Sequence, residues 1–331
     1  MRARTSGCLI FAFFLFPVLF APGAASQEIH LLGGAVQERD SRERSYSWAV
    51  QYLEGLGENW AVSFSWLNEG HFEHHRRDGH ALQIWARTKP LWKRLVLAAG
   101  IGPYRYYDTQ LAREGASYVD SHGWGIVTSF SASWHLDNRW IFSLQSNFVE
   151  TSRSIDSRSL LAGIGYQLDA SAPPDEKSAA TAGTESAARN EITVFGGQTV
   201  VNSRDSENAA ALMLEYRRNL GRHFDWTVGW LYEGDPGPVK RYGMLSQLWL
   251  VRRFFDDRLA LSAGGGAYIP VDRHRKPGEG GDDDPTLAGI ATMSAGYEFR
   301  PPWMIRISWN RVVTDYNRDT DVFLAGIGLR F

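Results

Sequence analysis

The stretch WAVSFSWLNEG, from Trp60 to Gly70, places a large apolar residue at every second position. Alternate residues of an extended strand point to opposite faces, so Trp60 and Trp66 share one face while the small and polar residues share the other, which ends at Glu69. A soluble sandwich buries its large aromatic residues, but here they bracket an aliphatic middle, as on a strand with lipid outside and a polar lumen inside. The stretch predicts a membrane-facing β-strand.

The second half of the chain repeats the first. WLNEG (Trp66 to Gly70) returns as WLYEG (Trp230 to Gly234). LLAGIGYQL (Leu160 to Leu168) returns as FLAGIGLRF (Phe323 to Phe331), in a register that differs from the first by a single position. A repeat that stays in register over a whole half of the chain indicates a duplicated domain and not a short solenoid unit.

Each copy contains eight alternating runs, separated by tight turns and by longer charged segments. Gly55 to Asn59 is typical of the tight turns. The long segments include Gln37 to Ser45, Glu69 to Asp78 and Asp272 to Pro285. Short turns at one end and long loops at the other are features of outer-membrane barrels, whose long loops are extracellular.

The segment between the copies, residues 169–190, is rich in Ala, Ser, Thr and Pro and has no apolar periodicity. It is expected to be a disordered periplasmic linker. A single sixteen-stranded barrel is the alternative, but it would join its eighth and ninth strands by a short turn. We therefore predict an all-β protein with two tandem eight-stranded antiparallel transmembrane barrels, over residues 27–168 and 191–331.

The N-terminal segment, residues 1–26, has the layout of a secretory signal peptide. Arg2 and Arg4 precede an apolar run and a small-residue stretch. The only cysteine, Cys8, lies in this segment, so a mature chain would have no disulfide and no thiolate metal site. Loss of the two arginines changes the formal charge from −2 to −4, which provides no basic field for nucleic acid.

Polar residues on the expected lumen faces are the best candidates for a functional site, because both copies keep several of them. The predicted lumen network consists of Glu69, Gln83, Asn147, Glu233, Gln247, Arg306 and Asn310. Polar groups in a closed lumen must satisfy one another, so a hydrogen-bonded plug is the main interpretation. A ligand pocket or narrow pore lining, and catalysis, are the alternatives.

The first copy gathers four histidines near acidic residues, between Glu69 and His80, in a pattern that can bind a divalent metal. The second copy has Asp235, Pro236 and Lys240 in the corresponding loop. We therefore predict no metal site, and the sequence indicates no cofactor and no particular small-molecule ligand.

The signal peptide, the eight runs per copy and the strand ends GIGYQL and GIGLRF resemble those of the small outer-membrane barrels OmpX, OmpW and the lipid A deacylase PagL. The resemblance implies the outer membrane of a Gram-negative bacterium, a wall in contact with lipid and lipopolysaccharide, and assembly by the outer-membrane insertion machinery, whose substrates commonly end in an aromatic residue such as Phe331.

The deacylase family carries a catalytic His-x-Ser-Asn stretch in its seventh strand. Leu144 to Asn147 and Ile307 to Asn310 take its place here, and both lack the histidine. We therefore assign no catalytic residue and expect a non-enzymatic structural, binding or narrow transport role. A lipid-A-modifying enzyme, a deacylase or an acyltransferase, is the alternative.

Overall fold

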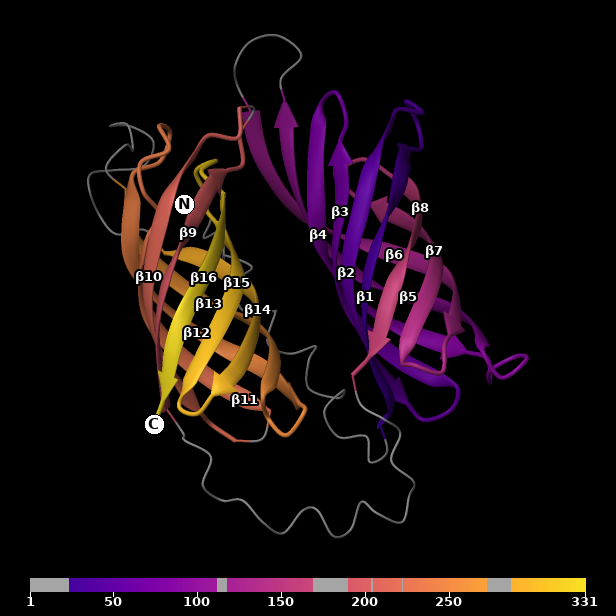
Figure 1. Ribbon diagram of the computed structural model, residues 1–331. Helices are drawn as coiled ribbons and strands as arrows, with labels where there is room; N and C mark the ends of the chain where they lie inside the picture. Colours follow the sequence, from indigo (N-terminus) through magenta and orange to yellow (C-terminus); the bar gives the residue numbers. More distant parts are fainter. Residues whose placement is uncertain (1–23, 112–117, 169–189, 204, 222, 273–286) are drawn as a thin grey trace, which may run out of the picture. The chain divides into compact units, whose positions relative to one another are not determined.

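A computed structural model describes residues 24–111, 118–168, 190–203, 205–221, 223–272 and 287–331 (Figure 1). The first copy forms β1 (Ala24–Glu38), β2 (Arg44–Leu56), β3 (Trp60–His71), β4 (His75–Arg87), β5 (Leu95–Leu111), β6 (Tyr118–His135), β7 (Trp140–Thr151) and β8 (Ser157–Gln167). The second copy forms β9 (Asn190–Val201), β10 (Asn208–Asn219), β11 (Phe224–Tyr232), β12 (Arg241–Phe254), β13 (Leu259–Asp272), β14 (Ala288–Arg300), β15 (Trp303–Val313) and β16 (Thr320–Arg330). In these ranges no helix is long and apolar enough to cross a membrane.

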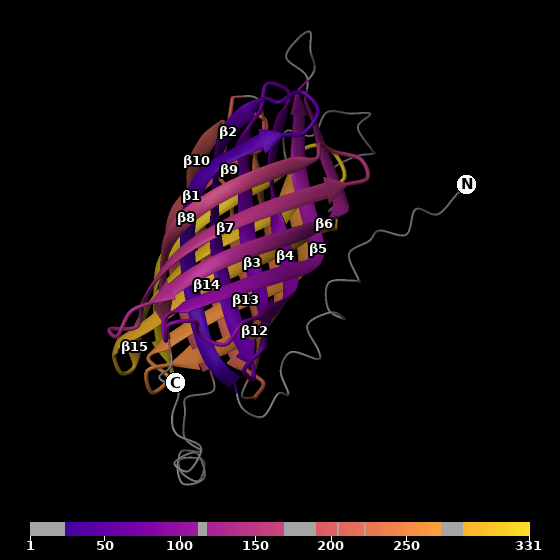
Figure 2. The same ribbon diagram turned by 90° about the vertical axis from the view of Figure 1, so that its right-hand side faces the viewer.

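The strands of each copy close into a barrel of their own (Figure 1; Figure 2). In the first barrel β1 pairs with β2 and with β8, so that His30 lies opposite Gln51 on one side and Gly165 on the other. In the second barrel β9 pairs with β10 and with β16. Every strand has two neighbours, and no unpaired edge remains. The structure thus shows two closed eight-stranded antiparallel barrels, as predicted, and the sixteen-stranded alternative is wrong.

The two faces of the wall differ in the way a membrane barrel requires. On β7, Phe142 and Leu144 are 55% and 49% exposed, whereas Ser143 and Gln145 between them are 8% and 6% exposed. Large apolar side chains therefore cover the outside and polar ones line the inside, which is the pattern of a transmembrane β-barrel. The fold class is accordingly an antiparallel transmembrane β-barrel.

Several strands run further than the hydrophobic pattern predicts. The segment from Glu69 to Asp78 is mostly strand and not a loop, because β3 continues to His71 and β4 begins at His75. Likewise β5 extends to Leu111, well past its apolar run. Where both faces of a strand meet water or polar groups, the alternation of hydrophobicity disappears although the backbone pairing continues.

Parts of the predicted domain organisation fall outside the described residues. Of the signal peptide only residues 24–26 are described, and they begin β1. Of the linker only Asn190 is described, as the first residue of β9. The limits of both segments stay predictions.

Glycines on the lumen face make room for large side chains. Trp85 is 1% exposed and donates its indole N–H to Ser63 Oγ at 2.8 Å. A Cβ atom on Gly100 would lie 2.5 Å from the Trp85 ring, so only glycine fits there. The second barrel repeats this packing with Trp249, Thr227 and Gly264.

Candidate functional site

We call the end of each barrel that holds its first and last strand residues the terminal end, and the opposite end the loop end. At the terminal end of the first barrel the Leu168 N–H donates to the Gln27 carbonyl at 2.7 Å. In the second barrel the Phe331 N–H donates to the Asn190 carbonyl at 2.9 Å.

A buried ion pair occupies the loop end of the second lumen. Arg241 Nε lies 2.6 Å from Glu233 Oε1, and Nη2 lies 2.7 Å from Oε2. Both side chains are completely buried. Thr320 donates its hydroxyl to Glu233 at 2.6 Å, and Arg241 Nη1 donates to the Arg318 carbonyl at 3.0 Å and the Tyr316 hydroxyl at 3.2 Å. The pair is thus satisfied by neutral partners as well as by its own charges, as a buried pair must be.

The first lumen contains the same ion pair at its loop end. Arg77 Nε lies 2.5 Å from Glu69 Oε2, and Nη2 lies 2.8 Å from Oε1. Tyr104 donates its hydroxyl to Glu69 at 2.9 Å, and the Ser157 hydroxyl contacts the same carboxylate. Both copies keep the pair, so we infer that it stabilises the barrel structure.

A chain of neutral hydrogen bonds crosses the middle of each lumen. In the first barrel Gln83 donates to Ser129 Oγ at 3.0 Å, and Ser129 donates to Asn147 Oδ1 at 2.7 Å. The second barrel has the matching chain, at 2.7 and 2.9 Å, from Gln247 through Thr292 to Asn310.

Charges fill the terminal end of the second lumen. Arg306 Nη1 lies 2.7 Å from Glu215 Oε1, and its Nη2 contacts Glu191. Arg217 lies 3.4 Å from Glu215 and 3.5 Å from Asp225. These residues form one connected ionic network.

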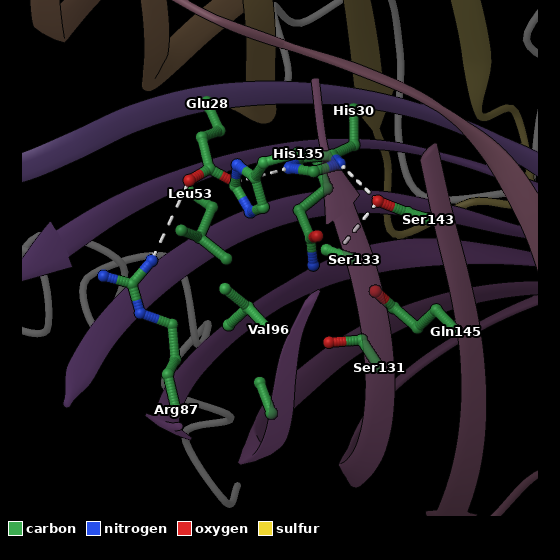
Figure 3. Close-up of a pocket in the computed structure, with 12 residues that line it drawn as sticks. Glu28, His30, Leu53, Arg87, Val96, Ser131, Ser133, His135, Ser143 and Gln145 are labelled. Carbon is green, nitrogen blue, oxygen red and sulfur yellow. Dashed lines mark hydrogen bonds and ion pairs between the residues drawn. The ribbon is translucent and has the colours of Figure 1, made fainter. Parts of the chain in front are cut away.

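The terminal end of the first lumen is built differently. His30 Nε2 lies 3.1 Å from Glu28 Oε2, and His30 Nδ1 lies 3.1 Å from Ser143 Oγ. Ser133 Oγ lies 3.1 Å from Ser143 Oγ, and Arg87 Nη1 lies 3.9 Å from Glu28 Oε1. Figure 3 shows His30 between the carboxylate of Glu28 and the hydroxyl of Ser143. A carboxylate, an imidazole and a hydroxyl are therefore joined in one hydrogen-bonded row.

A cavity of about 20 Å³ lies beside this row. A water molecule needs about 10–15 Å³ of accessible volume, so the cavity holds about one. Glu28, His30 and Ser143 are buried, whereas Ser131, Ser133 and His135 on β6, which also line the cavity, are half-buried. Figure 3 shows these side chains around the cavity. The cavity is lined by Glu28, His30 and Ser143 among other residues.

The structure places the predicted candidates inside the two lumens. All seven are buried: Glu69, Gln83, Asn147, Glu233, Gln247, Arg306 and Asn310. They lie at different levels of the lumens, at the loop end, in the middle or at the terminal end, and do not converge on one site.

Sequence analysis missed the arginines that pair with the two glutamates. Arg77 and Arg241 occupy matching positions of the repeat, in the same register as Glu69 and Glu233, but both lie in segments predicted to be loops. His30 has no such signal, since the second copy has Thr193 at the matching position.

The histidines of the first copy take separate partners. His75 Nδ1 lies 2.8 Å from Asp108 Oδ2, and the His80 ring stacks on Phe64 at 5.6 Å. In the part of the chain that the structure describes, no three His, Cys, Asp or Glu residues form a group that would hold a metal ion.

No family model and no curated protein matches the chain. Among solved structures, a de novo designed transmembrane β-barrel is 11% identical, with a TM-score of 0.31 over 44% of this chain and 98% of that one. Ail, the attachment invasion locus protein of Yersinia pestis, solved with the heparin analogue sucrose octasulfate, is 12% identical, with a TM-score of 0.32 over 43% of this chain and 96% of Ail. The monoaromatic hydrocarbon channel CymD is 9% identical, with a TM-score of 0.24 over 93% of this chain and 89% of CymD. The strand pairing and the apolar outer faces of this chain themselves define a transmembrane β-barrel.

Proposed function

We propose that the protein is an integral outer-membrane protein of a Gram-negative bacterium, with two plugged barrels that serve a structural or ligand-binding role and not free diffusion. The apolar outer faces and the longer connections at the loop ends support this location, with the loop ends outside the cell. The wall would contact outer-membrane lipid and lipopolysaccharide.

The main evidence that the two lumens are closed is the burial of the two loop-end ion pairs. Glu69 with Arg77, and Glu233 with Arg241, are 1% exposed or less at their side chains. An eight-stranded barrel encloses little more than its own side chains, whereas water-filled channels need many more strands. A lumen that contained a continuous water column would expose these charges. Their burial therefore favours plugged barrels over porin-type channels.

Assembly by the outer-membrane insertion machinery is part of this proposal, because β16 pairs with β9 and closes the second barrel as an antiparallel membrane barrel requires.

Conductance across planar lipid bilayers tests the closed state. We expect the purified, folded full-length protein to add no steady ohmic current, while a sixteen-stranded porin inserted in the same way gives stepwise channels. Heat-modifiable migration of the same sample on an SDS gel establishes that it is folded. Reproducible porin-size steps from folded protein would contradict the proposal.

A further inference from the structure

The duplication offers an internal comparison between the two lumens. The loop-end ion pair and the mid-lumen chain are the same in both barrels, so they serve the fold. At the terminal end, His30 and Ser143 of the first copy match Thr193 and Arg306 of the second, in the register that aligns Leu160 with Phe323. The row of carboxylate, imidazole and hydroxyl is therefore specific to the first barrel and is not required to build an eight-stranded barrel of this type.

Two glycines allow the row to form. His30 on β1 and Ser143 on β7 are separated by β8, on which Gly165 lies opposite His30 and Gly163 lies opposite Ser143. Neither glycine has a side chain that would stand between them. A Cβ on Gly165 would lie 2.5 Å from His30 Nδ1, so the backbone of β8 also limits where the imidazole ring lies.

One tautomer of His30 has the protonation pattern that nucleophilic catalysis needs. With its proton on Nε2, His30 donates to the Glu28 carboxylate, and the free electron pair on Nδ1 accepts the Ser143 hydroxyl proton. A base that contacts the nucleophile and is itself oriented by a carboxylate is the arrangement of serine hydrolases, recognised by geometry and not by sequence order. Ser133 lies beside the nucleophile, with its hydroxyl oxygen 3.1 Å from Ser143 Oγ.

We propose that Ser143, His30 and Glu28 form a hydrolytic site in the lumen of the first barrel, which takes esters of short carboxylic acids from the terminal end. Ser143 Oγ attacks the ester carbonyl carbon while its proton passes to His30 Nδ1. The bond from that carbon to the alcohol oxygen then breaks, and the imidazolium returns the proton to the leaving alcohol. A water molecule repeats the sequence on the acyl-serine and releases the carboxylic acid and the free serine.

The position of the site sets the substrate class. Ser143 points into the lumen, and its neighbour Leu144 points outward with 49% of its surface exposed. The barrel wall thus separates the nucleophile from the acyl chains of membrane lipids. The cavity of about 20 Å³ holds about one water molecule, so the substrate must have the smallest acyl part, such as acetyl, and side chains that line the cavity must move to admit it. This activity is additional to the closed-barrel role and requires no open pore.

Acetyl transfer from p-nitrophenyl acetate to the purified full-length protein tests the site. We expect release of p-nitrophenol together with one acetyl group, located on Ser143 by peptide mass spectrometry. Ser143→Ala should abolish this adduct, and His30→Gln should slow its formation by about 10²–10⁴-fold, the usual contribution of a general base. Ser146→Ala is the matched control, because Ser146 lies on the outer face of the same strand, and it should behave as wild type.

Two further checks distinguish loss of the site from failure of a variant to fold. Heat-modifiable migration identifies folded samples, and Glu28→Gln, which preserves the size of the side chain, is a second probe of the row and should also slow acetylation. Folded wild-type protein that carries no acetyl group on Ser143 and releases p-nitrophenol no faster than Ser143→Ala would overturn the proposal. So would acetylation of Ser143 at the wild-type rate in folded His30→Gln and Glu28→Gln.

Discussion

Arg241 holds Glu233 by two parallel contacts, with Nε 2.6 Å from Oε1 and Nη2 2.7 Å from Oε2, and neither side chain reaches solvent. Arg77 and Glu69 do the same in the first barrel, at 2.5 and 2.8 Å. Two planar groups that meet edge to edge fix the positions of β11 and β12, or of β3 and β4, relative to each other at the loop end. Both copies thus share the same buried pair at the same end of the lumen.

Removal of one partner of this pair should destabilise the barrel strongly. Arg241→Met leaves Glu233 buried without its counter-charge, which typically costs about 3–5 kcal/mol. Urea titration of the folded protein in lipid vesicles would measure the loss. The double variant Arg241→Met with Glu233→Leu should recover much of it, because no unpaired charge remains. A single variant with the wild-type urea midpoint would contradict the buried pair.

Each barrel should fold without the other. β1 to β8 and β9 to β16 close separately, so the strand pairing of each barrel is complete in itself. Residues 27–168 and residues 190–331, each behind the signal peptide, should insert and show heat-modifiable migration on an SDS gel. If neither half folds alone, the two barrels are interdependent in a way that their closed sheets do not explain.

Glycine is needed where a tryptophan ring packs, but not at every position of the wall. Gly100→Ala should destabilise the first barrel by about 1–3 kcal/mol, since its Cβ would lie 2.5 Å from the Trp85 ring. Gly33→Ala is the matched control in the same barrel, because nothing lies within 4 Å of its Cβ position. The difference between their urea midpoints measures the packing effect, and equal midpoints would refute it.

A charge on the outer wall should be costly only within the membrane. Leu144 and Leu91 are 49% and 41% exposed, but Leu144 lies within β7 whereas Leu91 lies in the turn between β4 and β5. Leu144→Arg should lose about 2–4 kcal/mol in lipid vesicles, the cost near the bilayer centre, and Leu91→Arg about 1 kcal/mol or less. Equal effects on the two unfolding midpoints would show that this face of β7 does not meet lipid.

Lipid A should be unaltered by the protein. The deacylase family that the sequence resembles has its histidine at the positions of Leu144 and Ile307. Both residues are aliphatic and lie on the outer wall, with 49% and 61% of their surface exposed. Mass spectra of lipid A from cells with and without the protein should therefore be the same. Loss or gain of one acyl chain, abolished by a single Ser or His substitution, would establish the enzymatic alternative.

The sequence by itself determined the barrel class and the inward direction of several lumen residues. Alternation along Trp60 to Gly70 assigns Glu69 to the inner face because the side-chain period of a strand is two. Glu233 matches Glu69 in the repeat, so it is assigned to the inner face as well. The segment between the copies favours two barrels over one. Each of these steps uses neighbours in the chain or the comparison of the copies, which a sequence displays directly.

Only the tertiary structure decided which lumen residues meet. Arg77 and Arg241 lie where hydrophobic alternation has already ended, so their inward direction follows from strand pairing that continues beyond the apolar runs. His30 and Ser143 are far apart in the chain and come from strands that are not hydrogen-bonded neighbours. Barrel closure brings β1 next to β8, and glycines on β8 let the two side chains reach across it. Barrel closure, and the placement of these glycines between His30 and Ser143, depend on strand pairing between distant parts of the chain, which a local sequence pattern does not contain.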